Sequence, residues 1–400
     1  MTTNPDTLGQ GPDLTRATAL SFPPAEYARR AGAVRAAVSA AGLDAVILTT
    51  PENICYVTGF HTPGYHIFQA AIVPARGEPF LVLRDIETDN ARTLSWVRDI
   101  EQVRDLDGPE RVLADALRAR GLGEGRIGLP ADSSFLSPAR ARAIAGALPE
   151  ATVIDVRAIV ETVRQTKSAA EVELIRRAAG VVDSAIVHAV EQLDDCETDS
   201  DVAAVVLNAI TRGGSGYTGS PAYVVAGAAS AAPHSVHAGR PIDGRGNVWV
   251  ELSASLDRYH GAASRVIVRG GRDADLDRVN AVSAAALEAM IAAMRPGATS
   301  GAVDAAGRDL VVAAGLGHAW RHRAGYSLGL SFPPGLGEGE IIDIKPGDPR
   351  PLQAGMVFHL IPILAIEGLG NVGCTETVLV TEDGGVSLCQ LPREVLYARP

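Results

Sequence analysis

The chain has 400 residues, of which 46% are hydrophobic and 21% are charged, and its formal net charge is −11. This composition is typical of a globular protein and excludes a disordered chain, and the length is enough for two domains. The negative charge argues against nucleic acid or an anionic membrane as the main partner.

Residues 1–22 are predicted to form a loosely docked arm, because they lack the basic start and apolar run of a signal peptide. No stretch approaches about 18 consecutive apolar residues, so no membrane span is expected. The four cysteines lie far apart, with no C-x-x-C spacing. These features predict a cytoplasmic protein with reduced thiols.

Strands and helices alternate over residues 23–162. An amphipathic helix over 24–42 ends at a glycine, and further helices are predicted at 109–120 and 137–148. The short apolar runs predicted as strands are DAVILTT, AAIVP, PFLVL, RIGLP and TVIDV. This alternation predicts a small α/β domain.

A long helix is predicted over 164–193, with Ser168 as its N-cap and Glu171 at the third helical position. The domain boundary is placed just before this helix, so residues 163–400 form the second domain. Its other helices are predicted at 199–212, 273–294 and 301–314. Glycine-rich strand pairs separate these helices, which predicts an α+β domain.

Glu251 is the strongest candidate for a chemical role, because it lies within the apolar strand NVWVELSA. A carboxylate inside such a strand is unfavourable unless it is paired or used. The alternative is a structural ion pair with Arg265. Glu376 lies in the similar strand TETVLVT, where it is either a second site carboxylate or a surface charge.

Histidines and a tyrosine supply further candidates. His234 lies in the loop GAASAAPHSVHAG, where a histidine pair binds metal only if the loop brings both rings together. Tyr326 lies in a glycine-rich, turn-prone stretch and is expected to be packed. His359 stands alone between apolar residues and is expected to be a satisfied core histidine, whereas His260 is expected to be solvated in a hairpin turn.

The order of these motifs resembles the creatinase/methionine-aminopeptidase family. RQTKSAAEVELIRRAA is similar to the R-x-x-K-S-x-x-E start of that family's catalytic domain. PHSVHAGRPIDGRGNVWVELSASLDRYHGAASR is similar to its histidine loop and carboxylate hairpin, and LQAGMVFHLIPI and TETVLVTEDG to its two glutamate segments. The resemblance covers nearly the whole chain and implies a creatinase-like α/β domain followed by an α+β domain of the pita-bread fold.

The metallopeptidases of this family bind two metal ions through two aspartates, a histidine and two glutamates. In this chain Glu251 stands at the first aspartate position and Ala262 at the second. Tyr326 stands at the histidine position, and Ile361 and Thr375 at the glutamate positions. Alanine and isoleucine offer no donor, although divalent cations need several. The resemblance therefore implies no dinuclear metal site and no cofactor.

Metal-free hydrolases of this family, such as creatinase and ectoine hydrolase, cleave C–N bonds of small amidine-type compounds. GYSLGLSFPP and LCQLPR resemble the ectoine enzyme, and Ile67 stands where creatinase carries an arginine for the substrate carboxylate. Two tryptophans expected in the ectoine enzyme are missing, one from GFHTPGY and one at Leu336. The resemblance implies a metal-independent hydrolase that opens ectoine to N-acetyl-2,4-diaminobutyrate.

By this resemblance the catalytic residues are Glu251, His234 and Glu376. Glu251 either attacks the amidine carbon or activates a water, and Glu376 holds a second N–H of the amidinium. His234 passes a proton to the leaving nitrogen. The predicted substrate-binding residues are Tyr326, Tyr65, Tyr259, His359 and Phe60.

Three alternatives stay open: a creatinase-like amidinohydrolase with another substrate, an Xaa-Pro-type metallopeptidase with an unusual mononuclear site, and a catalytically silent binding module. The lost ligands argue against the peptidase. The retention of His234, Glu251 and Glu376 argues against the silent module. The expected partner is a small-molecule substrate, and the resemblance implies a homodimer.

Overall fold

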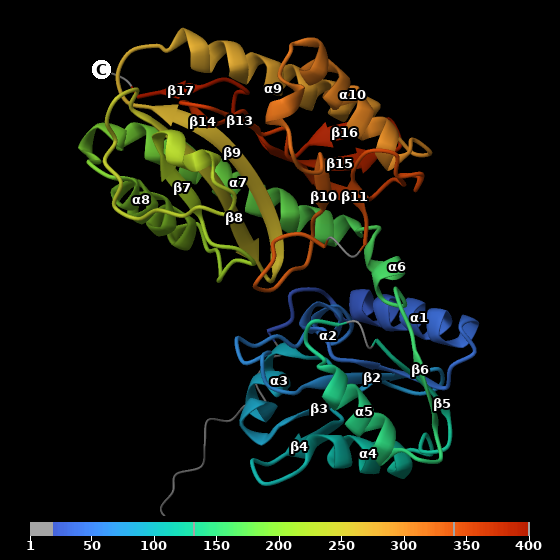
Figure 1. Ribbon diagram of the computed structural model, residues 1–400. Coiled ribbons are helices and arrows are strands. Elements are labelled where there is room, and N and C mark those ends of the chain that lie inside the picture. Colours follow the sequence, from blue (N-terminus) through green and yellow to red (C-terminus); the bar gives the residue numbers. More distant parts are fainter. Residues whose placement is uncertain (1–18, 131–132, 339–340, 399–400) are drawn as a thin grey trace, which may run out of the picture. The chain divides into compact units, whose positions relative to one another are not determined.

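The computed structural model describes residues 19–130, 133–338 and 341–398, so most of the predicted N-terminal arm lies outside the described residues. The chain divides into two compact units, Met1–Arg164 and Gln165–Pro400. Figure 1 colours the first unit from blue to green and the second from green to red. Within the described ranges, no helix is long and apolar enough to cross a membrane.

The first unit is built on a six-stranded mixed sheet with the strand order β4-β3-β2-β1-β5-β6. The strands are β1 (Ala45–Leu48), β2 (Ala70–Pro74), β3 (Phe80–Arg84), β4 (Ile100–Val103), β5 (Arg126–Leu129) and β6 (Thr152–Asp155). The helices are α1 (Pro24–Ala40), α2 (Pro51–Thr58), α3 (Thr88–Leu94), α4 (Pro109–Ala119), α5 (Pro138–Ala147) and α6 (Glu161–Arg164). The central strands β1 and β2 are buried throughout, as expected for apolar runs in a helix-covered sheet. The predicted α/β class is confirmed.

The second unit contains two larger sheets and a hairpin. The strand orders are β17-β9-β8-β7, β11-β10-β12-β15-β16 and β13-β14. The strands are β7 (Tyr223–Ala226), β8 (Asn247–Leu256), β9 (Tyr259–Val268), β10 (Gly325–Ser327), β11 (Asp343–Ile344), β12 (Val357–Leu360), β13 (Leu364–Ile366), β14 (Gly370–Val372), β15 (Glu376–Thr381), β16 (Gly384–Ser387) and β17 (Leu396–Tyr397). The helices are α7 (Ala169–Glu191), α8 (Asp199–Arg212), α9 (Ala274–Ala293) and α10 (Ser300–Ala313). The predicted α+β class is confirmed.

The β8–β9 hairpin is the longest strand pair of this unit, and a tight two-residue turn closes it. Asp257 and Arg258 both have positive φ, 49° and 69°, as the favoured two-residue hairpin turn requires. The Arg258 guanidinium lies over the rings of Tyr217 and Phe332, 3.9 Å and 4.6 Å from their centroids. These contacts hold an arginine in a conformation that non-glycine residues rarely adopt.

Helix α7 packs directly on the hairpin, and Gly261 makes this close approach possible. A β-carbon at Gly261 would lie 2.2 Å from the backbone nitrogen of Ala179 in α7. The Tyr259 hydroxyl donates to Glu171 at 2.8 Å, and the same glutamate closes the predicted capping box with Ser168. The helix thereby fixes the position of the strand pair.

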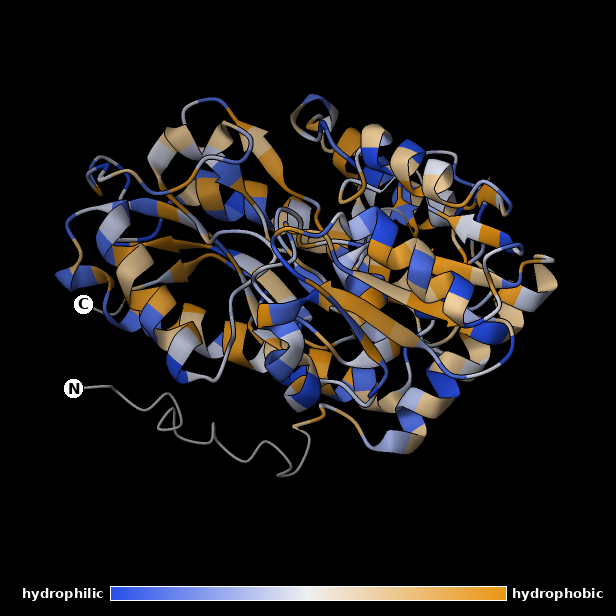
Figure 2. Ribbon diagram, turned by 90° about the horizontal axis from the view of Figure 1, so that it is seen from below, coloured by the Kyte–Doolittle hydropathy of each residue, from blue (hydrophilic) through white to orange (hydrophobic). Residues whose placement is uncertain are grey.

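Helices α9 and α10 pack against each other, and α9 also contacts the five-stranded sheet (Figure 1). The core of this part includes Trp249, Val266, Leu287 and Phe358. Figure 2 shows the strands predominantly orange and the helices striped with blue, as expected when apolar helix faces cover a sheet. The two larger sheets meet at Ser264 and Thr375, which form an isolated bridge.

Candidate active site

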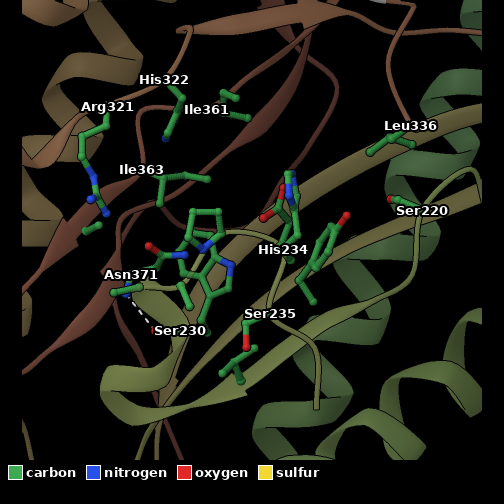
Figure 3. Close-up of a pocket in the computed structure, with 18 of the residues that line it drawn as sticks. Ser220, Ser230, His234, Ser235, Arg321, His322, Leu336, Ile361, Ile363 and Asn371 are labelled. Carbon is green, nitrogen blue, oxygen red and sulfur yellow. Dashed lines mark hydrogen bonds between the residues drawn. The ribbon is translucent and has the colours of Figure 1, made fainter. Parts of the chain in front are cut away.

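A cavity of about 730 Å³ opens in the second unit, within the size range of small-molecule sites. Its walls come from distant segments: β7, the loop after the short helix Gly227–Ala231, β8, the segment before β10, and the region from β12 to β14. In Figure 3, Arg321 and Asn371 lie at one end of the cavity and Ser220 and Leu336 at the other. Trp249, Glu251 and Leu252 line the cavity, so strand β8 of the hairpin supplies one of its walls.

Glu251 is the single acidic side chain among the described residues that line this cavity. It lies in the middle of β8, opposite Tyr223 of β7 and Ser264 of β9. Burial raises the pKa of the Glu251 carboxyl to about 7, and a hydrogen bond with the Trp249 side chain lowers it. The carboxyl can therefore gain or lose a proton near neutral pH, which suits a general base.

Two tyrosines accompany Glu251 in the cavity wall. Tyr223 lies opposite Glu251 in β7, and Tyr326 lies in β10. Burial raises the pKa of both phenols, and the negative charge of Glu251 raises both further. Both hydroxyls stay protonated at neutral pH and can donate or accept hydrogen bonds.

Tyr326 is joined to two buried residues behind the cavity wall. Its hydroxyl lies 2.8 Å from Nδ1 of His359, and Nε2 of His359 lies 2.7 Å from Oγ1 of Thr375. Burial lowers the pKa of His359 to about 3, so the ring is neutral and has one donor and one acceptor nitrogen. His359 therefore holds the tyrosine hydroxyl in a fixed position.

His234 lines the same cavity as Glu251, although the two residues come from separate segments. Its backbone has a φ of 59°, which is uncommon for a residue with a side chain. Its ring lies 6.3 Å from the ring of Tyr223, measured between centroids. Figure 3 shows His234 on a loop at the cavity wall. A histidine here can exchange protons with a bound ligand.

The residues at the predicted metal-ligand positions do not fit a divalent metal pair. Ala262 and Ile361 carry no donor atom. The backbone N–H of Ala262 donates to Thr377 Oγ1 at 2.9 Å, and this hydroxyl donates back to the Ala262 carbonyl at 2.8 Å. In the part of the chain that the structure describes, no three His, Cys, Asp or Glu side chains come together as a metal ion requires.

Glu376 does not lie where the sequence analysis expects it. The residue is 1% exposed and does not line the cavity. Arg265 Nη2 donates to Oε1 at 2.9 Å, Arg393 binds both carboxylate oxygens at 3.0 and 2.9 Å, and the Ser387 hydroxyl donates to Oε2 at 2.7 Å. This network satisfies Glu376 internally, so the predicted contact with substrate is corrected. The alternative ion pair of Glu251 with Arg265 is also corrected.

Three further predicted positions differ from the structure. Tyr259 is 1% exposed and does not line the cavity. Its hydroxyl donates a hydrogen bond to Glu171 of α7, which attaches the hairpin to this helix. His359 does not line the cavity, so its predicted contact with substrate is corrected. It is fully buried with two hydrogen-bond partners, which confirms the satisfied core histidine that its apolar neighbours predict. His260, expected in a solvated turn, is fully buried, and Gly219 N–H donates to its Nε2 at 3.0 Å. Burial lowers the pKa of this histidine to about 3.

Phe60 and Tyr65 belong to the first unit. Phe60 is fully buried, as expected for a core phenylalanine. The ring of Tyr65 packs edge-on against Phe135, with 5.7 Å between centroids. The cavity described above is lined by residues of the second unit, so a substrate contact of these two aromatic residues stays a prediction.

Tyr223, Trp249, Arg321 and Asn371 also line the cavity and are not among the site residues predicted from the sequence. Trp249 could have been found from strand alternation, because it lies two residues before Glu251 on the same strand face. The other three lie outside any motif, and folding alone brings them to the cavity.

Residues 173–382 match metallopeptidase family M24, and residues 30–166 match the creatinase/prolidase N-terminal domain. The ectoine hydrolase of Halomonas elongata is 26% identical and aligns with 94% of this chain and 98% of that protein. A probable dipeptidase PepE of Mycobacterium tuberculosis is 28% identical and aligns with 92% of this chain and 96% of that protein.

Solved structures resemble the whole chain as well. Dipeptidase PepE from Mycobacterium ulcerans aligns with a TM-score of 0.80 and 27% identity, over 94% of this chain and 99% of that one. An X-Pro aminopeptidase from Thermotoga maritima aligns with a TM-score of 0.81 and 21% identity, over 92% of this chain and 99% of that one. The second comparison shows a shared fold alone.

Proposed function

The chain belongs to metallopeptidase family M24 and carries a creatinase/prolidase N-terminal domain, and from this premise we propose that it is a metal-independent hydrolase of a small amidine-type compound. The proposed substrate is ectoine, a cyclic amidine with a carboxylate, because the described residues of the cavity do not fit a metal pair and one relative is named an ectoine hydrolase. The homodimer that the family resemblance implies is part of this proposal, and light scattering measures it.

The observation that carries the proposal is the carboxyl of Glu251, with a pKa of about 7, in a cavity that Tyr326 and Ile361 line at two of the other metal-ligand positions. Ala262 and Ile361 remove two donors, and Tyr326 and Thr375 place neutral hydroxyls where a histidine and a glutamate are expected. An amidinium cation pairs well with a buried carboxylate, because the pairing offsets the loss of hydration. The site thus favours a cationic ligand in place of the metal pair.

The proposed reaction begins with ionised Glu251 taking a proton from a water whose oxygen attacks the amidine carbon. The tetrahedral carbon then releases one nitrogen, the C–N bond breaks, and His234 donates a proton to that nitrogen. The products are an amide and a free amine, so water is the only co-reactant. Tyr326, held by His359, hydrogen-bonds the tetrahedral centre.

A dipeptidase is the second candidate, because a relative that aligns along nearly the whole chain is named a probable dipeptidase. The donor set argues against it, since peptide hydrolysis in this family relies on the metal pair that these residues do not fit. Hydrolysis of Xaa-Pro dipeptides by the purified protein, dependent on added Mn²⁺ or Zn²⁺, would favour the peptidase over the proposal.

The proposal is tested by replacing Glu251 with glutamine. We expect Glu251→Gln to lower the rate of ectoine ring opening by about 10²- to 10⁴-fold, because the general base is lost. The matched control is Glu382→Gln, since Glu382 is exposed and lies outside the cavity. Formation of N-acetyl-2,4-diaminobutyrate is the measurement, and an unchanged rate in the Glu251 variant would contradict the mechanism.

A further inference from the structure

Arg321 lines the cavity at the end marked by Asn371, and neither residue belongs to a recognised motif. Figure 3 shows the Arg321 side chain extending toward Asn371, with Ile363 beside it and Ser220 at the far end. Asn371 is held in position because its backbone N–H donates to Ser230 Oγ at 2.8 Å. Arg321 and Asn371 therefore line the same end of the cavity.

Arg321 differs from the arginines around it. Arg323 Nη1 donates to Asp343 at 3.1 Å, and Arg308 Nη2 donates to Asp304 at 2.7 Å. Arg321 makes no ion pair or side-chain hydrogen bond with any residue in the described ranges. Its five N–H donors are thus available to a ligand, whereas its neighbours are committed to the fold.

The cavity also has two electrically different regions. At the arginine end, the cavity is lined by Arg321 and Arg323. At the β7–β8 wall, Glu251 raises the pKa of Tyr223, as a negative charge does. A ligand with a cation and an anion on opposite sides matches this arrangement.

We propose that Arg321, together with the Asn371 amide, binds the carboxylate of a zwitterionic substrate whose amidinium group lies at Glu251. The inference rests on the proposed function and specifies its substrate class as amidinium carboxylates. The planar guanidinium can donate two parallel hydrogen bonds to one carboxylate, which fixes the orientation of the ring as well as its position. Arg321 is then a specificity-determining residue.

The test compares ectoine with 2-methyl-1,4,5,6-tetrahydropyrimidine, the same amidine ring without the carboxylate. Binding is followed by stopped-flow tryptophan fluorescence before turnover, since Trp249 lines the cavity. We expect the wild type to bind ectoine more tightly than the bare ring. Arg321→Gln should weaken ectoine binding by about tenfold or more and change binding of the bare ring by less than about twofold.

The matched control is Arg295→Gln, because Arg295 is exposed and lies outside the cavity, and we expect this variant to bind both compounds like the wild type. Equal weakening of both compounds in Arg321→Gln, no weakening of ectoine, or no preference for ectoine in the wild type would each overturn the inference. Product formation tests the proposed function separately. Arg321-dependent ectoine binding without hydrolysis would support the inference and refute the proposed function. Equal hydrolysis of ectoine and the bare ring would support the proposed function and refute the inference.

Discussion

Glu251 combines two demands that oppose each other. As a general base it must be ionised, but an ionised carboxylate in a buried wall lacks hydration, and its pKa therefore rises to about 7. In the structure the charge of Arg265 is committed to Glu376, so that arginine does not relieve this penalty. A bound amidinium would relieve it, because it places a positive charge against the carboxylate. Ionised Glu251 thus destabilises the folded protein without ligand and favours binding of an amidinium ligand.

This conflict predicts a pH-dependent stability difference. The Glu251 carboxyl titrates near 4.5 in the unfolded chain and at about 7 in the folded one. Between these values the folded state binds more protons, so the free energy of unfolding falls as pH rises, by on the order of 3 kcal/mol. We therefore expect Glu251→Gln to be more stable than the wild type at pH 8, with little difference at pH 4.

Urea denaturation of both proteins at the two pH values measures the effect, with Glu382→Gln as the control. Because Glu382 is exposed, Glu382→Gln should leave the free energy of unfolding unchanged at both pH values. A Glu251 variant that is no more stable than the wild type at pH 8 would show that the carboxylate finds a stabilising partner in the free protein.

Tyr326 provides a second prediction at this scale. Because His359 holds its hydroxyl at 2.8 Å, the hydroxyl is positioned before substrate binds. We expect Tyr326→Phe to lower kcat by about a hundredfold, and His359→Gln to lower it less, with folding retained. Tyr397→Phe is the control, since its hydroxyl bonds Asp277 outside the cavity. An unchanged kcat in Tyr326→Phe would remove this residue from the mechanism.

At the scale of elements, Glu376 joins β15 to β9 and to the C-terminal segment. Its carboxylate binds Arg265 of β9 and Arg393 near the chain's end, and all these contacts are buried or partly buried. Removing one charge of such a network leaves the partners unpaired. We expect Glu376→Gln to lower the free energy of unfolding by about 3–5 kcal/mol while the folded fraction keeps its turnover.

Denaturant unfolding and the rate per folded molecule, measured on the same preparation, separate the two effects. Glu382→Gln in the turn after β15 is again the matched control. Loss of turnover at unchanged stability would return Glu376 to the catalytic role that the sequence suggests.

The elements differ in how far their sequence predicts them. The capping box of Ser168 and Glu171 and the strand alternation around Glu251 are local patterns, so the α7 helix and the hairpin could be predicted. The partners of Glu376 come from distant segments, and no local pattern reveals them. The burial of His260 could not be predicted for the same reason, because it follows from packing of the hairpin against the segment around Gly219.

For the whole molecule, the net charge of −11 says little about the site. The cavity contains one described acidic side chain, Glu251, and the arginines 321 and 323. Family membership follows from motifs along nearly the whole chain, whereas the substrate depends on these few cavity residues. The fold and Glu251 could therefore be predicted from the sequence, whereas Arg321 could not, because folding alone brings it to the cavity.

The central claim is that hydrolysis here proceeds without a metal ion. The most direct measurement is ectoine turnover by protein that has been dialysed against a chelator, with the metal content determined by mass spectrometry on the same sample. The account predicts full turnover at far less than one metal ion per chain, with no gain on adding Mn²⁺, Zn²⁺ or Co²⁺. Turnover that disappears with the metal and returns when it is added back would contradict the account.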